Sequence, residues 1–156
     1  MAGYIKELRK SVGSKPIIMC GAGTFVFNKD NEILMIHRTD NNTWGIPGGA
    51  LELGESLEDA AKREVYEETN LIIKNLKLFD IFSGEDYYHK YPNGDEVYNV
   101  VTIYTTNEFK GQLKADGNES KEVKFYSLNN LPEKINPVDI HIIKSLKHTR
   151  RSCNFV

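Results

Sequence analysis

The pattern of apolar and polar positions along the chain predicts a mixed α/β protein. Dense apolar and β-branched runs, or alternation with a period of two, predict strands, whereas apolar positions three and four residues apart predict amphipathic helices. Strands are predicted at residues 17–27, 32–38, 71–83, 96–106 and 123–127, and helices at residues 3–12, 57–69 and 136–148. The turn-forming segment 28–31 favours a hairpin between the first two strands.

The helix predicted over residues 57–69 has a start signal and a stop signal. Ser56 and Asp59 form a capping pair, and the acidic first turn suits the positive end of the helix dipole. Asn70 follows the last helical residue and tolerates the left-handed conformation in which helices end.

Winding this helix at about 100° per residue places acidic side chains on the half that should be buried. Glu64, Glu67 and Glu68 share that half with its apolar positions, which are Leu57, Ala60, Ala61 and Val65. Like charges held together away from water are costly without a cation. Arg63 compensates in part, and magnesium or manganese, which prefer oxygen ligands, would balance the rest. The alternative is a solvated helix laced with salt bridges, as most charge runs are.

The segment around this helix carries a family signature. Residues 49–71 read GALELGESLEDAAKREVYEETNL and follow the spacing G-x5-E-x7-R-E-U-x-E-E-x-G-U, in which U is aliphatic. The matching positions are Gly49, Glu55, Arg63, Glu64, Val65, Glu67, Glu68 and Leu71. This stretch resembles the signature of the Nudix hydrolases. Asn70 stands where the family has glycine, but asparagine tolerates the same backbone conformation.

The resemblance covers roughly residues 17–130 and implies both a fold and an activity. The implied fold is a Nudix-type α/β/α sandwich around a central mixed β-sheet. The implied activity is the hydrolysis of a nucleoside diphosphate linked to another group X. Candidates for the substrate are nucleoside triphosphates, dinucleoside polyphosphates, nucleotide sugars, ADP-ribose and the 5′ end of RNA.

The resemblance also implies the metal site. Glu64, Glu67 and Glu68, with the carbonyl of Gly48, would hold one to three Mg²⁺ ions, for which Mn²⁺ is an alternative. Arg63 would orient the glutamates rather than touch substrate. The signature segment, residues 49–71, is called the box below. Within it, Glu55 would support the loop that precedes the helix or a second metal ion.

A further glutamate is expected shortly before the strand at residues 123–127. The order E-S-x-E-x-x-aromatic, which begins at Glu119, resembles the Nudix segment that often brings another glutamate to the metal. Glu119 is the preferred candidate, with Glu122 as the second, and the alternative is that both are solvated loop charges. The general base is expected to be Glu64 or Glu119, with Glu64 preferred.

Three residues are candidates for binding the substrate. Arg38 ends a predicted strand and would hold a phosphate through its fork of donors, or is a simple surface arginine. Tyr87 and Tyr88 lie with His89 and Tyr91 in one aromatic loop, and this cluster would stack a nucleobase, or pack within a hairpin. A proline that ADP-ribose pyrophosphatases carry near this distance from the box is missing, which weighs against that substrate.

Composition sets the remaining expectations. The chain has 156 residues, of which 40% are hydrophobic and 27% charged, and its net charge is −2. These values predict a single domain over residues 1–156 with no DNA-binding surface. No apolar run is long enough for a membrane span, and two distant cysteines favour a reduced, cytoplasmic setting. The expected partner is a small nucleotide, and a homodimer is also considered.

Two other functions fit parts of the sequence. The first is a non-catalytic regulatory domain on the Nudix scaffold that binds a nucleotide or ADP-ribose. Such relatives usually lose glutamates of the box, whereas this chain keeps them. The second is an acidic helix that binds calcium without any hydrolysis.

Overall fold

The computed structural model describes residues 3–153, with side chains described as far as residue 150. The helices are α1 (Gly3–Val12), α2 (Leu57–Thr69), α3 (Pro137–Cys153) and the short 3-10 helix η1 (Glu85–Tyr87). The strands are β1 (Ile17–Val26), β2 (Ile33–Arg38), β3 (Trp44–Gly45), β4 (Gly48–Ala50), β5 (Ile72–Lys74), β6 (Lys77–Phe82), β7 (Tyr88–Lys90), β8 (Glu96–Thr106), β9 (Glu108–Lys110) and β10 (Ser120–Tyr126). Among the described helices, none is both long and apolar enough to cross a membrane.

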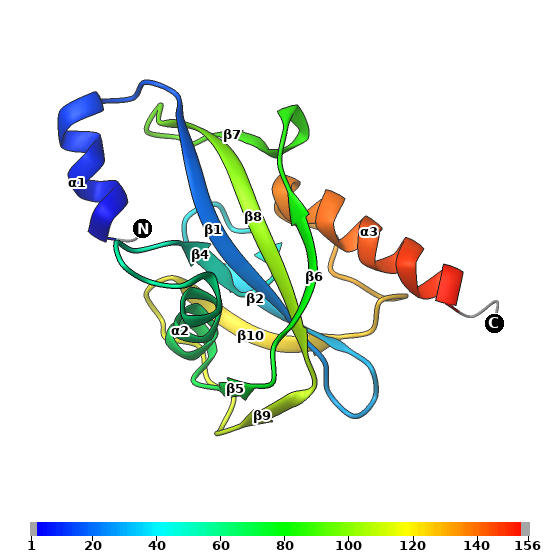
Figure 1. Cartoon of the computed structure of the whole chain (residues 1–156). Helices are drawn as coiled ribbons and strands as arrows, with labels where there is room; N and C mark the ends of the chain where they lie inside the picture. The colour runs from blue at the N-terminus through cyan, green and yellow to red at the C-terminus, as the bar shows by residue number, and fades with distance from the viewer. Residues whose placement is uncertain (1–2, 154–156) are drawn as a thin grey trace.

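A mixed sheet forms the centre of the molecule (Figure 1). Its strands run in the order β4-β1-β8-β6, and β7 adds to β8. The long strands β1 and β8 pair in parallel along their whole length, whereas β4, β6 and β7 are antiparallel to their neighbours. A second sheet has the order β10-β2-β3, and β5 pairs with β9. The predicted α/β class with a central mixed sheet is confirmed.

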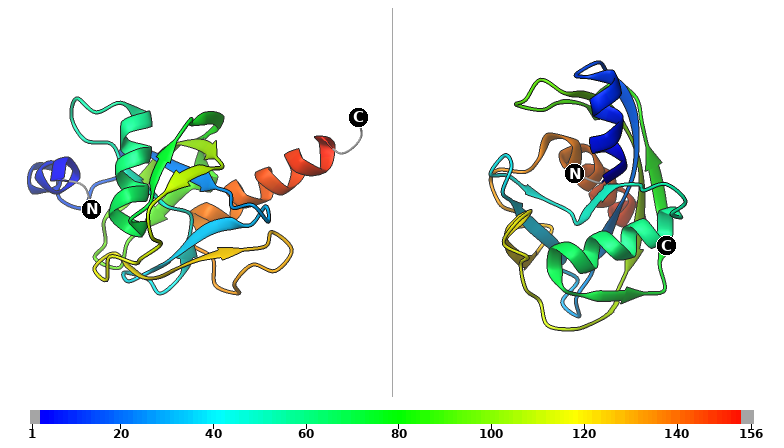
Figure 2. Two further views of the ribbon diagram at one scale, coloured as in Figure 1. Left: turned by 90° about the horizontal axis from the view of Figure 1, so that it is seen from below. Right: turned by 90° about the vertical axis from the view of Figure 1, so that its left-hand side faces the viewer.

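Helices α2 and α3 cover opposite faces of the central sheet (Figure 2). Neighbouring residues of a strand point to opposite faces. Accordingly, Ile103 of β8 packs in a cluster with residues of α3, while Tyr104 packs against Ala60 and Ala61 of α2. A third apolar cluster, which includes Val65, joins α2 to β2 and β5. The central sheet is therefore packed between the two helices.

The structure corrects two expectations about the strands and one about a helix. The predicted hairpin is wrong beyond its turn, because β2 pairs with β10 and β3. Near the turn, Phe27 forms a bridge with Ile33 and the N–H of Asn28 donates to the Glu32 carbonyl, but β1 and β2 belong to different sheets. A strand that is apolar on both faces does not specify its partner. The strand predicted over residues 71–83 divides into β5 and β6, between which Asn75 takes a positive φ of 50°. Helix α3 extends beyond residue 148 to Cys153.

Helix α2 has the bounds that its local signals predict. The Ser56 side chain accepts a hydrogen bond from the N–H of Asp59 at 3.1 Å. At the other end, Asn70 adopts the left-handed conformation with a φ of 61° and donates its N–H to the carbonyl of Tyr66. Both caps satisfy backbone groups that the helix alone leaves unpaired, which is why sequence locates this helix accurately.

Candidate active site

A cavity of about 600 Å³ opens between the central sheet, α2, α3 and the loops around them. Two groups of side chains in its lining recur below. The carboxylate group consists of Glu64, Glu68 and Glu119. The hairpin wall, built by β7, the turn after it and β8, consists of His89, Tyr91 and Asn99.

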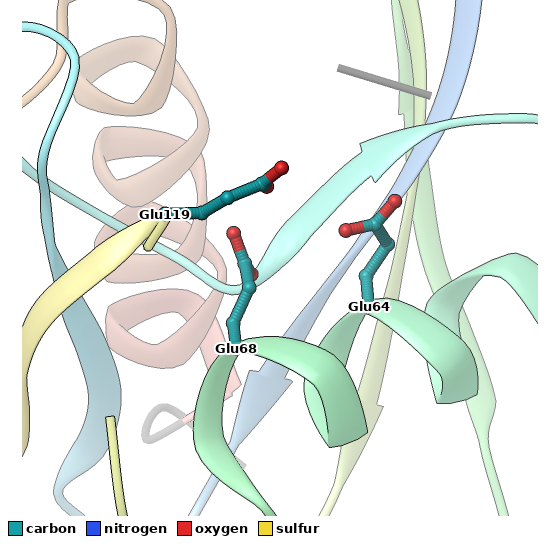
Figure 3. A group of neighbouring side chains, drawn as sticks. All are labelled: Glu64, Glu68 and Glu119. Carbon is teal, nitrogen blue, oxygen red and sulfur yellow. The ribbon is translucent and has the colours of Figure 1, made fainter. Parts of the chain in front are cut away.

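The carboxylate group brings together residues that are far apart in the sequence (Figure 3). Glu64 and Glu68 lie one turn apart on α2 and are only 6% and 3% exposed, whereas Glu119 is exposed. Each residue offers one carboxylate oxygen, and these oxygens all lie within 4.8 Å of one another. Three hard oxygen donors at this spacing fit a divalent cation such as Mg²⁺ or Mn²⁺.

A tight turn places Glu119 beside α2. The Asp116 carboxylate accepts hydrogen bonds from the N–H groups of Glu119 and Ser120. The Ser120 hydroxyl donates to the backbone carbonyl of Glu68 at 2.8 Å, and Ser120 is fully buried. This contact joins the start of β10 directly to the helix that carries the other two glutamates.

The electrostatics of the carboxylate group favour a bound cation. Burial raises the pKa of Glu68 well above its usual value, and the charge of nearby Glu64 raises it further. Burial also raises the pKa of Glu64, although the hydrogen bond from Arg63 opposes that shift. The N–H of Gly48 donates to Glu68 at 3.0 Å and stabilises its charge in part. A divalent cation would offset the remaining cost of holding these carboxylates away from water.

Arg63 connects the box loop to the glutamates of α2. Its Nε and Nη2 donate to the two oxygens of Glu55 at 2.7 and 2.9 Å. Its Nη1 donates to Glu64 at 2.6 Å and to Glu67 at 3.2 Å, and its Nη2 also reaches the carbonyl of Ala50. These contacts hold the guanidinium in one place, so it can orient carboxylates on both sides.

Gly48, just before the box, and Gly49, its first residue, permit a close approach of β4, β1 and α2. A β-carbon at Gly48 would meet the backbone of β1, and one at Gly49 would collide with the Glu64 carboxylate. Side chains at these positions would therefore push β4 away from the sheet or displace Glu64. Close packing explains the glycine pair, which has no positive φ.

The structure separates the glutamates that the sequence groups together. Glu67 does not share the buried half of α2, because its side chain is 56% exposed. It lines the cavity but is not one of the three carboxylates whose oxygens lie within 4.8 Å of one another. Its angular position at the border of the buried half explains this difference. Glu122 is exposed and lies opposite His37 in the register of β10 and β2. Glu119 is therefore the glutamate that lies beside Glu64 and Glu68 of α2.

The candidate substrate residues also have different positions. Arg38 lines the cavity and donates two hydrogen bonds to Asp40, at 3.0 and 2.8 Å. Tyr87 and Tyr88 are absent from the cavity lining. Tyr87 packs against Phe82 and against His141 of α3, and the hydroxyl of exposed Tyr88 donates to Glu96 of β8. The structure therefore does not bring these two tyrosines to the site.

Sequence reasoning missed Asn99 and Asp139, whereas it included His89 and Tyr91 in the aromatic cluster but preferred Tyr87 and Tyr88 as substrate residues. His89 and Tyr91 pack edge to face with ring centroids 4.6 Å apart. Asn99 is a polar residue on the β8 face that also carries buried Val97, a contrast that is visible in the sequence. Asp139 of α3 is buried, accepts from Asn136, and has its pKa raised by burial to about 6.

Comparison with known proteins identifies the family. Residues 19–146 match the family model of the NUDIX domain. An ADP-ribose pyrophosphatase of Methanocaldococcus jannaschii is 38% identical over 111 residues, which cover 69% of this chain and 62% of that protein. The chain thus aligns with less than two thirds of that relative's length. The chain belongs to the Nudix family.

Two solved structures share the fold. A MutT NUDIX hydrolase from Burkholderia pseudomallei has a TM-score of 0.69 at 23% identity, over 83% of this chain and 97% of that one. The NUDIX domain of Shewanella oneidensis NrtR, solved with ADP ribose, has a TM-score of 0.69 at 16% identity, over 96% of this chain and 99% of that one. These similarities confirm the predicted Nudix architecture.

Proposed function

We propose that the chain is a metal-dependent pyrophosphohydrolase that cleaves the pyrophosphate bond of a nucleoside diphosphate linked to a group X. The observation that carries this proposal is the carboxylate group in the wall of the cavity. Glu64, Glu68 and Glu119 would hold Mg²⁺, or Mn²⁺ in its place, and Glu67 and the Gly48 carbonyl, whose residues also line the cavity, are further candidate ligands. The metal would neutralise phosphate charge and lower the pKa of a bound water.

The remaining chemistry belongs to the side chains around the metal site. Glu64 is the proposed general base, because burial raises its pKa toward the range in which a carboxylate accepts a proton near neutral pH. Arg63, fixed between Glu55 and Glu64, holds that carboxylate in one orientation. Glu119, the second candidate for the base, lies on the exposed side of the group.

The polar and aromatic lining of the cavity supports a nucleotide substrate. Asp40 engages Nε and Nη2 of Arg38, which leaves Nη1 as the donor for a phosphate oxygen. We propose that His89 and Tyr91 take the stacking role that the sequence suggested for Tyr87 and Tyr88. Aromatic rings hold a base through its face, which suits this wall to a nucleobase.

ADP-ribose and nucleoside triphosphates are the substrates to test first. The relative from Methanocaldococcus jannaschii is named an ADP-ribose pyrophosphatase, and the NrtR domain was solved with ADP ribose. The first similarity favours ADP-ribose, although the proline noted above is missing, whereas the NrtR domain at 16% identity supports the fold alone. The MutT hydrolase has the same fold at low identity, so it supports the scaffold and not a choice of substrate.

A hydrolysis screen with Mg²⁺ or Mn²⁺ tests the proposal. The wild type and the Glu68→Gln variant are incubated with ADP-ribose, nucleoside triphosphates, dinucleoside polyphosphates and nucleotide sugars, and the products are separated by chromatography. Cleavage of one class by the wild type, with loss in the variant, is expected. Tight binding of ADP-ribose by the wild type without turnover of any compound would instead support the regulatory alternative.

A further inference from the structure

Helix α1 begins against the loop at the start of the signature segment 49–71. The N–H groups of Gly3 and Tyr4, in the first turn of α1, donate to the two carboxylate oxygens of Glu52. A carboxylate at this end of a helix satisfies unpaired N–H groups and interacts favourably with the helix dipole. Gly3 and Glu52 both line the cavity, so this contact forms part of its wall.

Hydrogen bonds continue from Glu52 to the carboxylate group. Glu52 and Glu55 bond each other reciprocally: the N–H of Glu52 donates to the Glu55 carboxylate at 3.1 Å, and the N–H of Glu55 donates to the Glu52 carbonyl at 3.2 Å. Glu55 in turn accepts from Arg63, which donates to Glu64 at 2.6 Å. The position of Glu64 is therefore connected to α1 through three intervening side chains.

Near its C-terminal end, α1 contacts the turn between β7 and β8. Arg9 donates to the carbonyl of Glu96 at 2.8 Å, and its Nε lies 3.6 Å from the Asp95 carboxylate. Both side chains of this ion pair are nearly buried, at 10% and 13% exposure. The Asp95 carbonyl accepts from the N–H of Tyr91 at 2.8 Å, which links Arg9 to the hairpin wall.

These end contacts determine where α1 lies. The helix has ten residues, of which only Ile5 is buried. A helix of this length is marginal by itself, and little apolar burial holds it on the body. Figure 1 shows α1 beside β1, running between the loop after β4 and the turn between β7 and β8. The helix thus contacts, at its two ends, the loop after β4 and the turn between β7 and β8, and both segments border the cavity lining.

We propose that α1 acts as a brace, and that Glu52 and Arg9 are positioning residues for the proposed hydrolysis. Glu52 fixes the box loop and, through Glu55 and Arg63, the orientation of Glu64. Arg9 fixes the turn that carries Tyr91 and so the hairpin wall. Glu52 lies at a position that the family signature quoted above does not specify.

The two tethers predict different kinetic effects. Glu52→Ala should lower kcat about tenfold with KM within about twofold, because a small displacement of a catalytic group is costly. Glu52→Gln keeps one acceptor and should lie between this variant and the wild type. Arg9→Ala should raise KM about fivefold with little change in kcat. The double variant should combine the loss of kcat with the rise of KM, because each tether fixes a different segment.

Two matched controls lie on the same helix. Glu7 and Lys10 form an exposed pair at 2.6 Å, with side chains about 70% exposed. Glu7→Gln and Lys10→Ala should leave kcat and KM unchanged. Hydrogen exchange of residues 50–56 and 88–96, measured without substrate, should increase in Glu52→Ala and Arg9→Ala but not in the controls.

This inference rests on the proposed function only for its kinetic part. If the wild type hydrolyses none of the screened compounds, the proposed function fails, while hydrogen exchange still decides whether α1 braces the two segments. Wild-type hydrogen exchange and kinetics in Glu52→Ala and Arg9→Ala would overturn the brace. Equal losses of kcat and melting temperature in both variants, without the split between kcat and KM, would also overturn it.

Discussion

The carboxylate group and the hairpin wall line the same cavity but are built in different ways. Two members of the carboxylate group lie one turn apart on α2, whose caps and loop are encoded in one continuous stretch. The hairpin wall comes from β7, the turn after it and β8, and its residues reach the cavity through strand register. The two buried carboxylates therefore depend on local sequence, whereas Glu119 and the hairpin wall depend on pairing between segments.

The largest expected effect is the loss of kcat when a buried glutamate, rather than exposed Glu67, is replaced. Glu68→Gln should lower kcat by about a thousandfold, because it removes a charge from the carboxylate group. The melting temperature of the metal-free protein should stay the same or rise. Burial raises the pKa of Glu68, so its charged form is less favourable in the folded protein than in the unfolded chain. Steady-state kinetics and thermal unfolding measure both effects.

Glu67→Gln is the matched comparison on the same helix. Because Glu67 is exposed and contacts Arg63 instead of the group, the loss of kcat should be smaller, about a hundredfold. Unchanged turnover in Glu68→Gln would contradict the metal-site proposal. A larger loss in Glu67→Gln than in Glu68→Gln would show that the exposed glutamate is the principal ligand.

The sequence predicts α2 accurately because its signals are local. Ser56 and Asn70 satisfy backbone groups within one turn, so no distant segment is needed to locate the helix ends. The partner of β2 depends on which strand meets it from afar, and its apolar residues suit more than one neighbour. The choice of Glu119 over Glu122 likewise depends on an irregularity in the register of β10.

The tyrosine cluster shows the same limit on a smaller scale. Side chains alternate along the segment from Tyr88 to Tyr91, so that His89 and Tyr91 line the cavity while Tyr88 is exposed. A shift of one residue would exchange the two sets. Composition identifies an aromatic segment, but only the pairing of β7 with β8 decides which rings face the cavity.

The second expected effect is a rise in KM, which tests whether Tyr91 rather than Tyr88 contacts the substrate. Tyr91→Ala should raise KM about tenfold or more with kcat within about threefold, since stacking on a base is worth about 1–3 kcal/mol. Tyr88→Ala should leave KM unchanged, because Tyr88 is absent from the cavity lining. Steady-state kinetics on the substrate found in the screen measures both. The reverse result would return the stacking role to the tyrosine that the sequence suggested.

The smallest expected effect concerns Asp139, which lines the cavity but belongs to neither region. Burial raises the pKa of Asp139 to about 6, above the value of about 3.9 in an unfolded chain. Between these values the folded protein binds the proton more tightly, so this carboxyl contributes stability at low pH that is lost as the pH rises through about 6. Asp139→Asn does not titrate.

The wild type should therefore lose about 2 kcal/mol of unfolding free energy relative to Asp139→Asn between about pH 4.5 and about pH 7.5. Urea unfolding of both proteins at both pH values measures this difference, and every other titrating group cancels in the comparison. A difference that is constant with pH would show that Asp139 titrates normally and is hydrated. A change in the opposite direction would mean that the nearby guanidinium of Arg38 outweighs burial and holds Asp139 ionised. That outcome would make Asp139 part of the charged framework around Arg38, and the cavity lining near α3 would then be negatively charged throughout the measured range.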